Sequence, residues 1–482
     1  MTGYLSRLLR SGAAYQVAAA LSAVIALVLL PLYTRYLTRA DYGLAELVLV
    51  IVLSLSILVR LGVIEAFVRL HFLDEDAERR RRLAGTALAV LLAGTTALAL
   101  LMGLFADPLS ELLFDRRDGT LVWLTALGVW AFTNLEGAYA LLRVEERRRI
   151  YLIASLSNVA LTVGLTILLV VGLGEGARGY VLGNYGASAV VLLALWVVLR
   201  DRLARPAPRR ELGPMLRFGL PTVPAELSVF ALNVVDRFWV ARASGAAALG
   251  LYSLAAKLAG VIILVVRAFQ YAWPPLAYSV RDDEEAARLY AVVATYYVLA
   301  TGLLVTALTL LGRWVLRVFA APDFFGAHVA LPWLALGWAL YGLYLVLVVA
   351  AGRARVTSRN FPAALAGLVV NVAALALLVG PLGIAGAGIA LAVAYVVMIA
   401  VLFILTRRVF PVAFEWGRLA RVVCVLAVVA VGGELLLPET GAAGLLSRLA
   451  AVALTVPLLA AVGFLRRDEI VSMRRLLVRR RS

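Results

Sequence analysis

The sequence is poor in the residues from which soluble catalytic and metal-binding sites are built. Charged residues make up 16% of the chain, whereas soluble domains carry about 25%. The single cysteine, Cys424, excludes a disulfide framework. The two histidines, His71 and His328, stand far apart without neighbouring ligands, so no metal site is expected. With 63% hydrophobic residues and a mean hydropathy of +0.95, the composition excludes a soluble enzyme, a nucleic-acid-binding module and a disordered scaffold.

Lysine is almost absent. Of the 46 basic residues only Lys257 is a lysine, and the others are arginines, which is typical of a GC-rich coding bias. The excess over 29 acidic residues gives a net charge of +17. Lys257 therefore stands out as the one position at which lysine remains.

Long apolar runs dominate the chain instead. A helix needs about 20 apolar residues to cross the hydrocarbon core of a membrane. Fourteen such runs, continuous rather than alternating, are bounded by charge, proline or glycine. They lie near 14–36, 43–68, 83–105, 120–142, 150–172, 178–199, 217–241, 247–272, 286–311, 329–351, 361–380, 384–406, 419–437 and 444–465. The sequence predicts an all-α integral membrane protein with fourteen transmembrane helices.

The arginines are distributed unevenly between the two sides of these spans. Thirty-three lie in the termini and the loops of one side, and nine lie in the loops of the other side. Because positive charge favours the cytoplasmic side, we expect a multi-pass protein of the cell membrane with both termini in the cytoplasm. The nine outer arginines are Arg35, Arg39, Arg116, Arg117, Arg178, Arg242, Arg313, Arg317 and Arg448. The four remaining basic residues fall inside spans and are Arg60, Arg237, Lys257 and Arg267.

Self-comparison reveals a weak internal repeat at an offset near 207 residues. The offset pairs Arg10 with Arg217, Gly12 with Gly219, Arg35 with Arg242, Gly43 with Gly250, and Arg60 with Arg267. Each repeat contains six spans, an even number, so both repeats are expected to enter the membrane in the same direction. We predict an N-lobe at 1–205 with spans 1–6, a C-lobe at 206–408 with spans 7–12, and a region at 409–482 with spans 13–14 and a basic cytoplasmic tail.

Three segments carry a family resemblance. The sequence LPLYTRYLTRADYG at 30–43, the sequences DRF and ALGLYSLAAKL at 236–258, and PLGIAGAGIA at 381–390 resemble polysaccharide-type flippases. These are the O-antigen and exopolysaccharide repeat-unit exporters of the multidrug/oligosaccharidyl-lipid/polysaccharide superfamily. The resemblance implies two parallel six-helix lobes around a central cavity plus two extra helices. It also implies alternating access and a polyprenyl-pyrophosphate-linked oligosaccharide as the cargo, moved from the inner to the outer leaflet.

Basic residues at membrane depth are costly and usually face a cavity or a partner. Arg60 and Arg267 occupy matching repeat positions in the cytoplasmic half, where they either bind the pyrophosphate from two sides or extend to the inner headgroups. Lys257 either lines the cavity or forms an ion pair with Asp236 or Glu226, and the two roles are compatible.

Span 7 carries a polar stripe that could also line the cavity. Glu226, Asn233 and Arg237 are spaced seven and four residues apart, so they share one helix face. Asn233 and Arg237 are candidate substrate contacts. Glu226 is a candidate for an ion pair or for carrying a coupling proton or sodium ion, and Asp236 is a candidate anchor for Lys257 or Arg267.

Two further carboxylates are candidates for ion pairs or coupling. Glu136 lies seven residues before Arg143 on one face of span 4, which fits a structural pair or a cavity lining. Glu65 lies five residues after Arg60, about 140° further around a helix, so no direct pair between them is expected.

The sequence shows no catalytic constellation, and we expect neither an enzyme nor a cofactor. No glycine-rich phosphate loop precedes Lys257, and the outer loops lack a paired acid and base. The expected partners are the lipid-linked oligosaccharide and membrane lipids, with a polysaccharide polymerase and glycosyltransferases as candidates and no nucleic acid. The alternatives are a drug or cation antiporter or a peptidoglycan lipid II flippase of the same superfamily, and, from another class, a membrane glycosyltransferase or polymerase.

Overall fold

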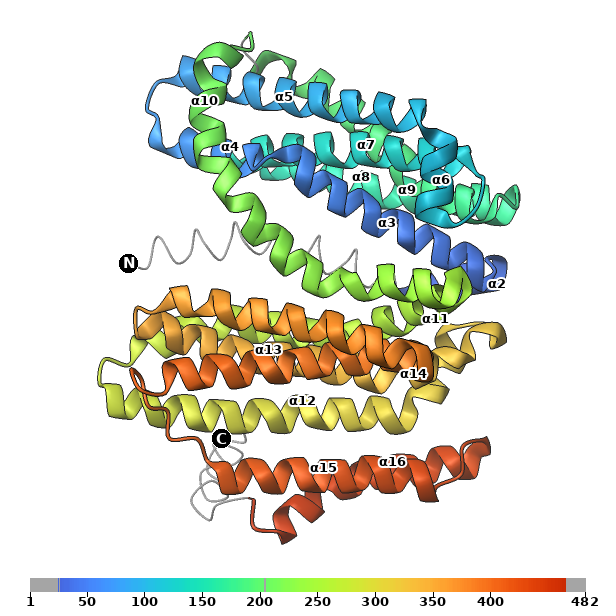
Figure 1. Ribbon diagram of the computed structural model, residues 1–482, viewed down its shortest axis with the longest axis vertical. Helices are drawn as coiled ribbons and strands as arrows, with labels where there is room; N and C mark the ends of the chain where they lie inside the picture. The colour runs from blue at the N-terminus through green and yellow to red at the C-terminus, as the bar shows by residue number, and fades with distance from the viewer. Residues whose placement is uncertain (1–24, 26, 203–204, 465–482) are drawn as a thin grey trace, which may run out of the picture. The chain divides into compact units, whose positions relative to one another are not determined.

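The computed structural model describes residues 25, 27–202 and 205–464, and every regular element in these residues is a helix (Figure 1). The chain divides into two compact units, Met1–Gly250 and Leu251–Ser482. The predicted first span at 14–36 lies mostly outside the described residues. The second half-repeat is predicted to start at residue 206, whereas the first compact unit extends to Gly250, because helix α10 (Pro208–Gly219) packs on helices of that unit.

The helices of the first unit lie side by side and bury an aliphatic core (Figure 1). Leu83, Leu91, Leu135, Leu192 and Met215 are among its fully or almost fully buried side chains. In chain order the elements are α2 (Leu30–Tyr36), α3 (Arg39–Arg60), α4 (Val63–Leu73), α5 (Ala77–Leu104), α6 (Ala106–Phe114), α7 (Gly119–Val144), α8 (Arg148–Thr166), the π-helical η1 (Ile167–Gly172), α9 (Gly176–Leu199), η2 (Arg200–Arg202), α10, η3 (Leu220–Thr222) and the first part of α11 (Val223–Ser279).

Helix α3 has a defined start and a defined break. Thr38 and Asp41 form a capping box at its first turn, in which each side chain accepts a hydrogen bond from the backbone N–H of the other residue. After Arg60, the left-handed residues Leu61 (φ 51°) and Gly62 (φ 68°) end α3, and α4 starts at Val63. The span predicted at 43–68 is therefore two helices rather than one.

The second unit contains the remainder of α11 and five further long helices. They are α12 (Asp283–Phe319), α13 (Leu331–Arg353), α14 (Asn360–Thr406), α15 (Trp416–Leu436) and α16 (Gly441–Ala461), with the 3-10 turns η4 (Pro322–Val329) and η5 (Thr357–Arg359). Helix α12 continues to Phe319, eight residues past the end of the span predicted at 286–311, and η4 occupies most of the remaining predicted outer loop.

Ten helical stretches in the described residues are long and apolar enough to cross a membrane. Two of them, Phe230–Ser279 and Thr357–Thr406, are 50 residues long. Each contains a glycine with non-helical angles, Gly245 or Gly383, at a position where the sequence predicts a loop between two spans. Helix α7 covers the predicted span at 120–142 but is not among the ten. The number of fourteen spans stays a prediction.

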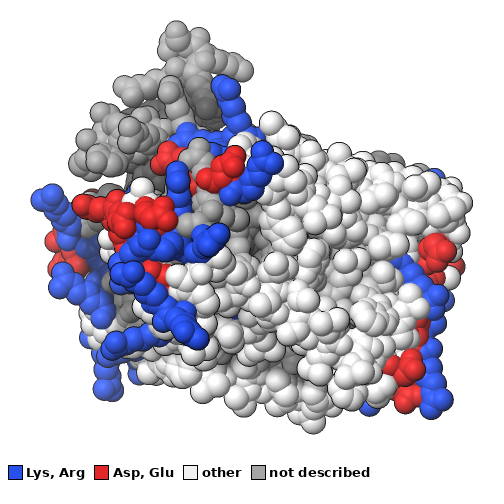
Figure 2. Space-filling view, turned by 90° about the horizontal axis from the view of Figure 1, so that it is seen from above, with Lys and Arg blue, Asp and Glu red and all other residues white. Residues whose placement is uncertain are grey.

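The charged side chains of the face in Figure 2 gather at two opposite ends and leave a broad uncharged surface between them. Large apolar side chains such as Leu104, Leu377 and Leu436 are strongly exposed on the helices. Soluble monomers rarely expose continuous apolar surface of this extent. The surface and the ten apolar helices are those of a multi-pass membrane protein.

Two segments that the repeat relates contact each other closely in the first unit. A Cβ atom on Gly43 would lie 1.8 Å from the carbonyl oxygen of Ala246, and one on Gly250 would lie 2.1 Å from the carbonyl oxygen of Arg39. Because Arg39 and Ala246 are themselves 207 residues apart, each segment presents the same groups to the other. A two-fold axis between equivalent segments produces this pattern. The contact is symmetric under the offset of 207 residues, and the repeat itself stays a prediction.

We expect Gly43→Ala and Gly250→Ala to destabilise the protein to a similar degree. A methyl group at either position has no room against a backbone carbonyl, and overpacking of this kind costs about 1–3 kcal/mol. Gly260→Ala is the matched control, because this helical glycine has open space around it and alanine is the better helix former. Thermal unfolding of the purified variants measures the effect. If one of the two variants is as stable as the control, the close contact does not require glycine at both positions.

Candidate functional site

Arg60, the last residue of α3, forms ion pairs with two carboxylates. Its Nη2 donates to Glu226 Oε1 of α11 at 2.5 Å, and its Nη1 lies 3.8 Å from Glu65 Oε1 of α4. The arginine side chain is 13% exposed and each carboxylate side chain is 36% exposed. We call Arg60, Glu65 and Glu226 the Arg60 cluster. It places one guanidinium between two carboxylates from separate helices.

The ion pair between Arg60 and Glu65 contradicts the prediction from the sequence that these two residues do not pair directly. The angle of about 140° between the two residues assumes a continuous helix. The left-handed Leu61 and Gly62 interrupt the helix and turn α4 so that Glu65 comes back toward Arg60.

The backbone also approaches closely at this break. A Cβ atom on Gly62 would lie 2.2 Å from the carbonyl oxygen of Gly219, at the end of α10. This close packing, together with the following η3 turn, positions the start of α11 and hence Glu226. The sequence contained one sign of this helix break, because Gly62 is a glycine inside a predicted span.

A third predicted carboxylate lies near the Arg60 cluster. The charge of Arg60 acts on Glu136 of α7, whose Oε2 lies 4.0 Å from Arg143 Nη2. The structure thus contains the pair of Glu136 and Arg143 that the sequence offered as one reading. A hydrogen bond from Thr133 Oγ1 to Ser56 Oγ, 2.9 Å long, fastens α7 to α3 beside these charges.

Two buried atoms of the Arg60 cluster have no hydrogen-bond partner among the residues that the structure describes. They are Arg60 Nε and Glu65 Oε2. Buried polar atoms are normally satisfied, so an unsatisfied donor and an unsatisfied acceptor within one cluster require an explanation. The cluster has unused capacity for an additional ligand or ion.

The other predicted residues of α11 lie further along the helix. Arg237 Nη1 donates to the backbone carbonyl of Asn233 at 2.8 Å, and Asp236 is buried and accepts a hydrogen bond from the backbone N–H of Arg237 at 2.7 Å. Lys257 and Arg267 belong to the second compact unit, where Lys257 is half-buried and Arg267 is exposed. Of the predicted site residues, the structure brings together Arg60, Glu65, Glu136 and Glu226.

The second unit contains a cavity of about 820 Å³ between α12, η4, α13 and α15. Its walls are mostly apolar and include Val305, Leu336 and Leu426. Arg313 and Glu434 line the cavity at one end.

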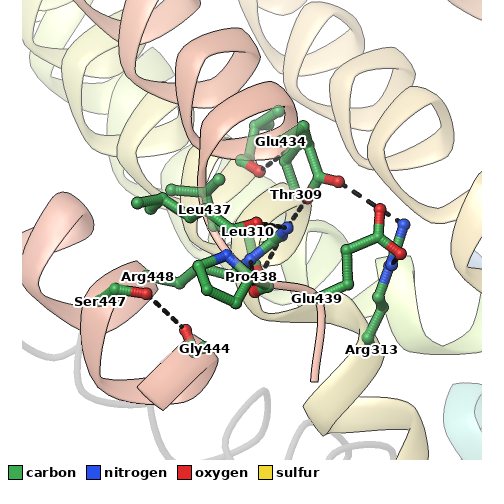
Figure 3. Close-up of polar contacts among 11 residues, drawn as sticks. Thr309, Leu310, Arg313, Glu434, Leu437, Pro438, Glu439, Gly444, Ser447 and Arg448 are labelled. Atoms are coloured by element: carbon green, nitrogen blue, oxygen red, sulfur yellow. Dashed lines mark hydrogen bonds and ion pairs between the residues drawn. The ribbon is translucent and has the colours of Figure 1, made fainter. Parts of the chain in front are cut away.

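A network of charges closes this end (Figure 3). Arg448 of α16 is fully buried and donates to the carbonyl oxygens of Leu310, Leu437 and Pro438 at 3.1, 3.3 and 3.1 Å and to the carboxylate of Glu434. Glu434 Oε2 lies 3.8 Å from Arg313 Nη2, and Arg313 forms a second ion pair with Glu439. We call Arg313, Glu434, Glu439 and Arg448 the Arg448 cluster.

Glu439 stands outside the spans, in the turn between α15 and α16. The hydrogen bond and the positive charge of Arg313 hold the pKa of Glu439 below its ordinary value. The carboxylate is therefore ionised at neutral pH.

The expectation that Arg448 lies in an outer loop is wrong. The structure places it inside α16, fully buried. A signal was present in the sequence, since Glu434 and Arg448 are opposite charges near the adjoining ends of two consecutive predicted spans. An ion pair across a short turn is the arrangement that lets both charges enter the membrane region.

Comparison with known proteins places the chain in a family. A family model described as "Polysaccharide biosynthesis protein" matches residues 8–280, which is more than half of the chain. The chain belongs to the polysaccharide biosynthesis protein family. No curated protein matches the sequence at a significant level.

Solved structures show the fold of this polysaccharide biosynthesis protein in more distant proteins. The lipid II flippase MurJ in an inward closed conformation is 15% identical, with a TM-score of 0.74 over 95% of this chain and 99% of that chain. An inward-facing multidrug resistance MATE transporter of the MOP superfamily is 18% identical, with a TM-score of 0.62 over 78% and 92%. The Vibrio cholerae MATE transporter VcmN in the bent form is 15% identical, with a TM-score of 0.52 over 84% and 97%. The family model confirms the resemblance to a polysaccharide family that the sequence indicated, and the solved structures show a shared fold.

We expect Arg448→Met to lower the free energy of unfolding by about 3 kcal/mol, because removal of one partner leaves buried carbonyl groups and the Glu434 carboxylate without their donor. Arg421→Met is the matched control, since Arg421 is an exposed arginine of α15 with one hydrogen bond to a carbonyl, that of Gly463. Chemical or thermal unfolding in detergent compares the two variants. Equal stability of both would show that the Arg448 cluster does not hold α16 in place.

Proposed function

We propose that this polysaccharide biosynthesis protein is a flippase that moves a polyprenyl-pyrophosphate-linked oligosaccharide from the inner to the outer leaflet of the cell membrane. The observation that carries the proposal is the Arg60 cluster, an arginine inside a predicted span that carboxylates from two other helices hold. The family supports a role in polysaccharide synthesis. The fold likeness to MurJ and MATE proteins supports transport by alternating access.

The ion pairs of Arg60 suggest how the cargo would enter. A guanidinium binds carboxylate and phosphate oxygens through the same forked N–H groups. A pyrophosphate that arrives from the cytoplasm therefore competes with Glu226 and Glu65 for Arg60. Once it is bound, repulsion between like charges drives the Glu226 carboxylate away, and the start of α11 loses its tie to α3. Cargo binding thereby favours a second conformation, because the cargo binds the two conformations with different affinity.

The remaining predicted residues complete the proposed path. The inner location of Arg60 rests on the arginine distribution, which predicts that both termini lie in the cytoplasm. Arg267, at the equivalent repeat position, supplies a second group for the pyrophosphate. Lys257, Arg237 and Asn233 contact the sugar further along the path. The enzymes that supply and consume such a cargo are glycosyltransferases and a polysaccharide polymerase, and we propose them as partners.

A cation-coupled drug antiporter is the second candidate, and one observation favours it. The Arg60 cluster contains two carboxylates for one guanidinium. A bound proton or cation would balance this excess of negative charge. If the protein is a flippase, the same excess of negative charge makes Glu65 or Glu226 the residue that binds the coupling proton or sodium ion.

The double variant Arg60→Ala with Arg267→Ala is expected to abolish export while the protein stays inserted in the membrane. Arg35→Ala with Arg242→Ala is the matched control, because these exposed arginines are related by the same offset and lie in predicted outer loops. The leaflet distribution of lipid-linked oligosaccharide in cells measures flipping, and an immunoblot of the membrane fraction measures insertion. Full export by the first double variant, or accumulation of lipid II alone, would refute the proposal.

Glu226→Gln is expected to raise the affinity for a soluble probe, farnesyl pyrophosphate, about tenfold, because Arg60 loses a competing charge. Arg60→Gln is expected to lower it by a similar factor. Glu111→Gln serves as the control, since Glu111 of α6 pairs with Arg117 and lies outside the cluster. Isothermal titration calorimetry on the purified protein gives the affinities. An antiporter site would instead show no pyrophosphate binding and a loss of cation binding in Glu226→Gln.

A further inference from the structure

The cavity of the second unit has no role in the transport proposed at Arg60. Its volume of about 820 Å³ falls in the range of about 300–1,000 Å³ that is usual for sites holding one organic ligand. Helices α12, α13 and α15 and the η4 turn supply its walls. The walls are mostly apolar, and the two charged lining residues, Arg313 and Glu434, lie with His328 at one end.

The cavity opens sideways along α15. Three of its lining residues, Val423, Val431 and Leu435, are strongly exposed, and Leu435 is 78% exposed. Exposed apolar side chains on a spanning helix face the hydrocarbon of the bilayer, because no other apolar solvent surrounds them. A lipid chain can therefore enter from the bilayer without passing through the protein.

At the polar end of the cavity, Arg313 forms an ion pair with a carboxylate that can move away. Arg313 is held by Glu439, which is 56% exposed and stands in the short turn between α15 and α16. Glu434, the other carboxylate beside Arg313, is bound to the fully buried Arg448 (Figure 3). The two carboxylates therefore differ, since Glu439 can move into water whereas Glu434 is fixed.

We propose that the cavity binds one anionic phospholipid of the surrounding bilayer, with an acyl chain between α12, α13 and α15 and the phosphate on Arg313 in place of Glu439. A phosphodiester carries one negative charge, so this exchange conserves the charge of the site. Arg448 keeps Glu434 and the helix ends in position while Glu439 moves. The site is independent of the cargo site at Arg60.

Two properties favour a bilayer phospholipid over the cargo lipid. Phospholipid is the solvent of the spans and is present in large excess, so mass action fills a slot that opens to the bilayer even at low affinity. The arginine distribution also predicts that Arg313 lies at the outer end of its span, at the level of the outer headgroups. Trp314 and Trp333 flank this end, as is usual for aromatic residues at the level of the headgroups.

Native mass spectrometry of the full-length protein tests the proposal with three lipids that have identical acyl chains. We expect phosphatidylglycerol to bind about tenfold more tightly than phosphatidylcholine or diacylglycerol. Arg313→Gln should remove this preference, and Arg317→Gln, which changes an exposed arginine one turn further along α12, should keep it. Ala430→Trp should reduce binding of phosphatidylglycerol by filling the cavity with a side chain.

Glu439→Gln makes the test independent of misfolding, because we expect it to increase phosphatidylglycerol retention about tenfold. Equal binding of the three lipids, an unchanged preference in Arg313→Gln, or no gain in Glu439→Gln would overturn the proposal. Displacement of phosphatidylglycerol by a polyprenyl pyrophosphate at equal concentration would also overturn it and identify the cargo as the occupant. None of these results depends on whether Arg60 takes part in flipping.

Discussion

A charge at membrane depth has no water to solvate it, so oxygen atoms of the protein have to accept the hydrogen bonds of every buried arginine. The helices that supply these oxygens are thereby fixed to one another. Arg448 joins α16 to α12 and α15 through carbonyl groups and Glu434. At the other end of the same helices, Arg418 of α15 donates to the carbonyl of Phe464 and to Glu415. The pair of α15 and α16 is thus held at both ends, with the apolar cavity beside it.

Local breaks in the helices decide which charges meet. A side chain on a continuous helix can reach only the neighbours on its own face. The left-handed residues at Leu61 and Gly62 remove this limit, so that Glu65 and Arg60 come together although five residues separate them. Gly62 also lets α10 approach its backbone, and this contact positions Glu226. One break therefore contributes to both ion pairs of Arg60.

Much of this architecture follows from the sequence, because apolar length and the distribution of arginine are properties of the chain itself. Gly245 and Gly383 interrupt long helices where the composition predicts loops. An isolated charge is costly in lipid, so the positions of Arg60 and Glu226 inside predicted spans already mark them in the sequence as candidate site residues. Their pairing could not be read from the sequence, since it needs the left-handed turn at the non-glycine Leu61 and the packing of α10. The cavity beside α15 is likewise a product of tertiary packing between helices far apart in the chain.

The type of oxygen atom that accepts from an arginine decides whether the arginine can exchange its partner for another anion. Backbone carbonyls cannot leave their helices, so Arg448 and Arg353, which donate mainly to carbonyls, are bound permanently. A carboxylate on a half-exposed side chain can turn into water and give way to another anion. Arg60 and Arg313 are held chiefly in this second way, by Glu226 and Glu439. An anionic lipid that displaces either carboxylate gains a charge-assisted contact without leaving a buried group unsatisfied. For this reason both proposed sites lie at arginines held by carboxylates.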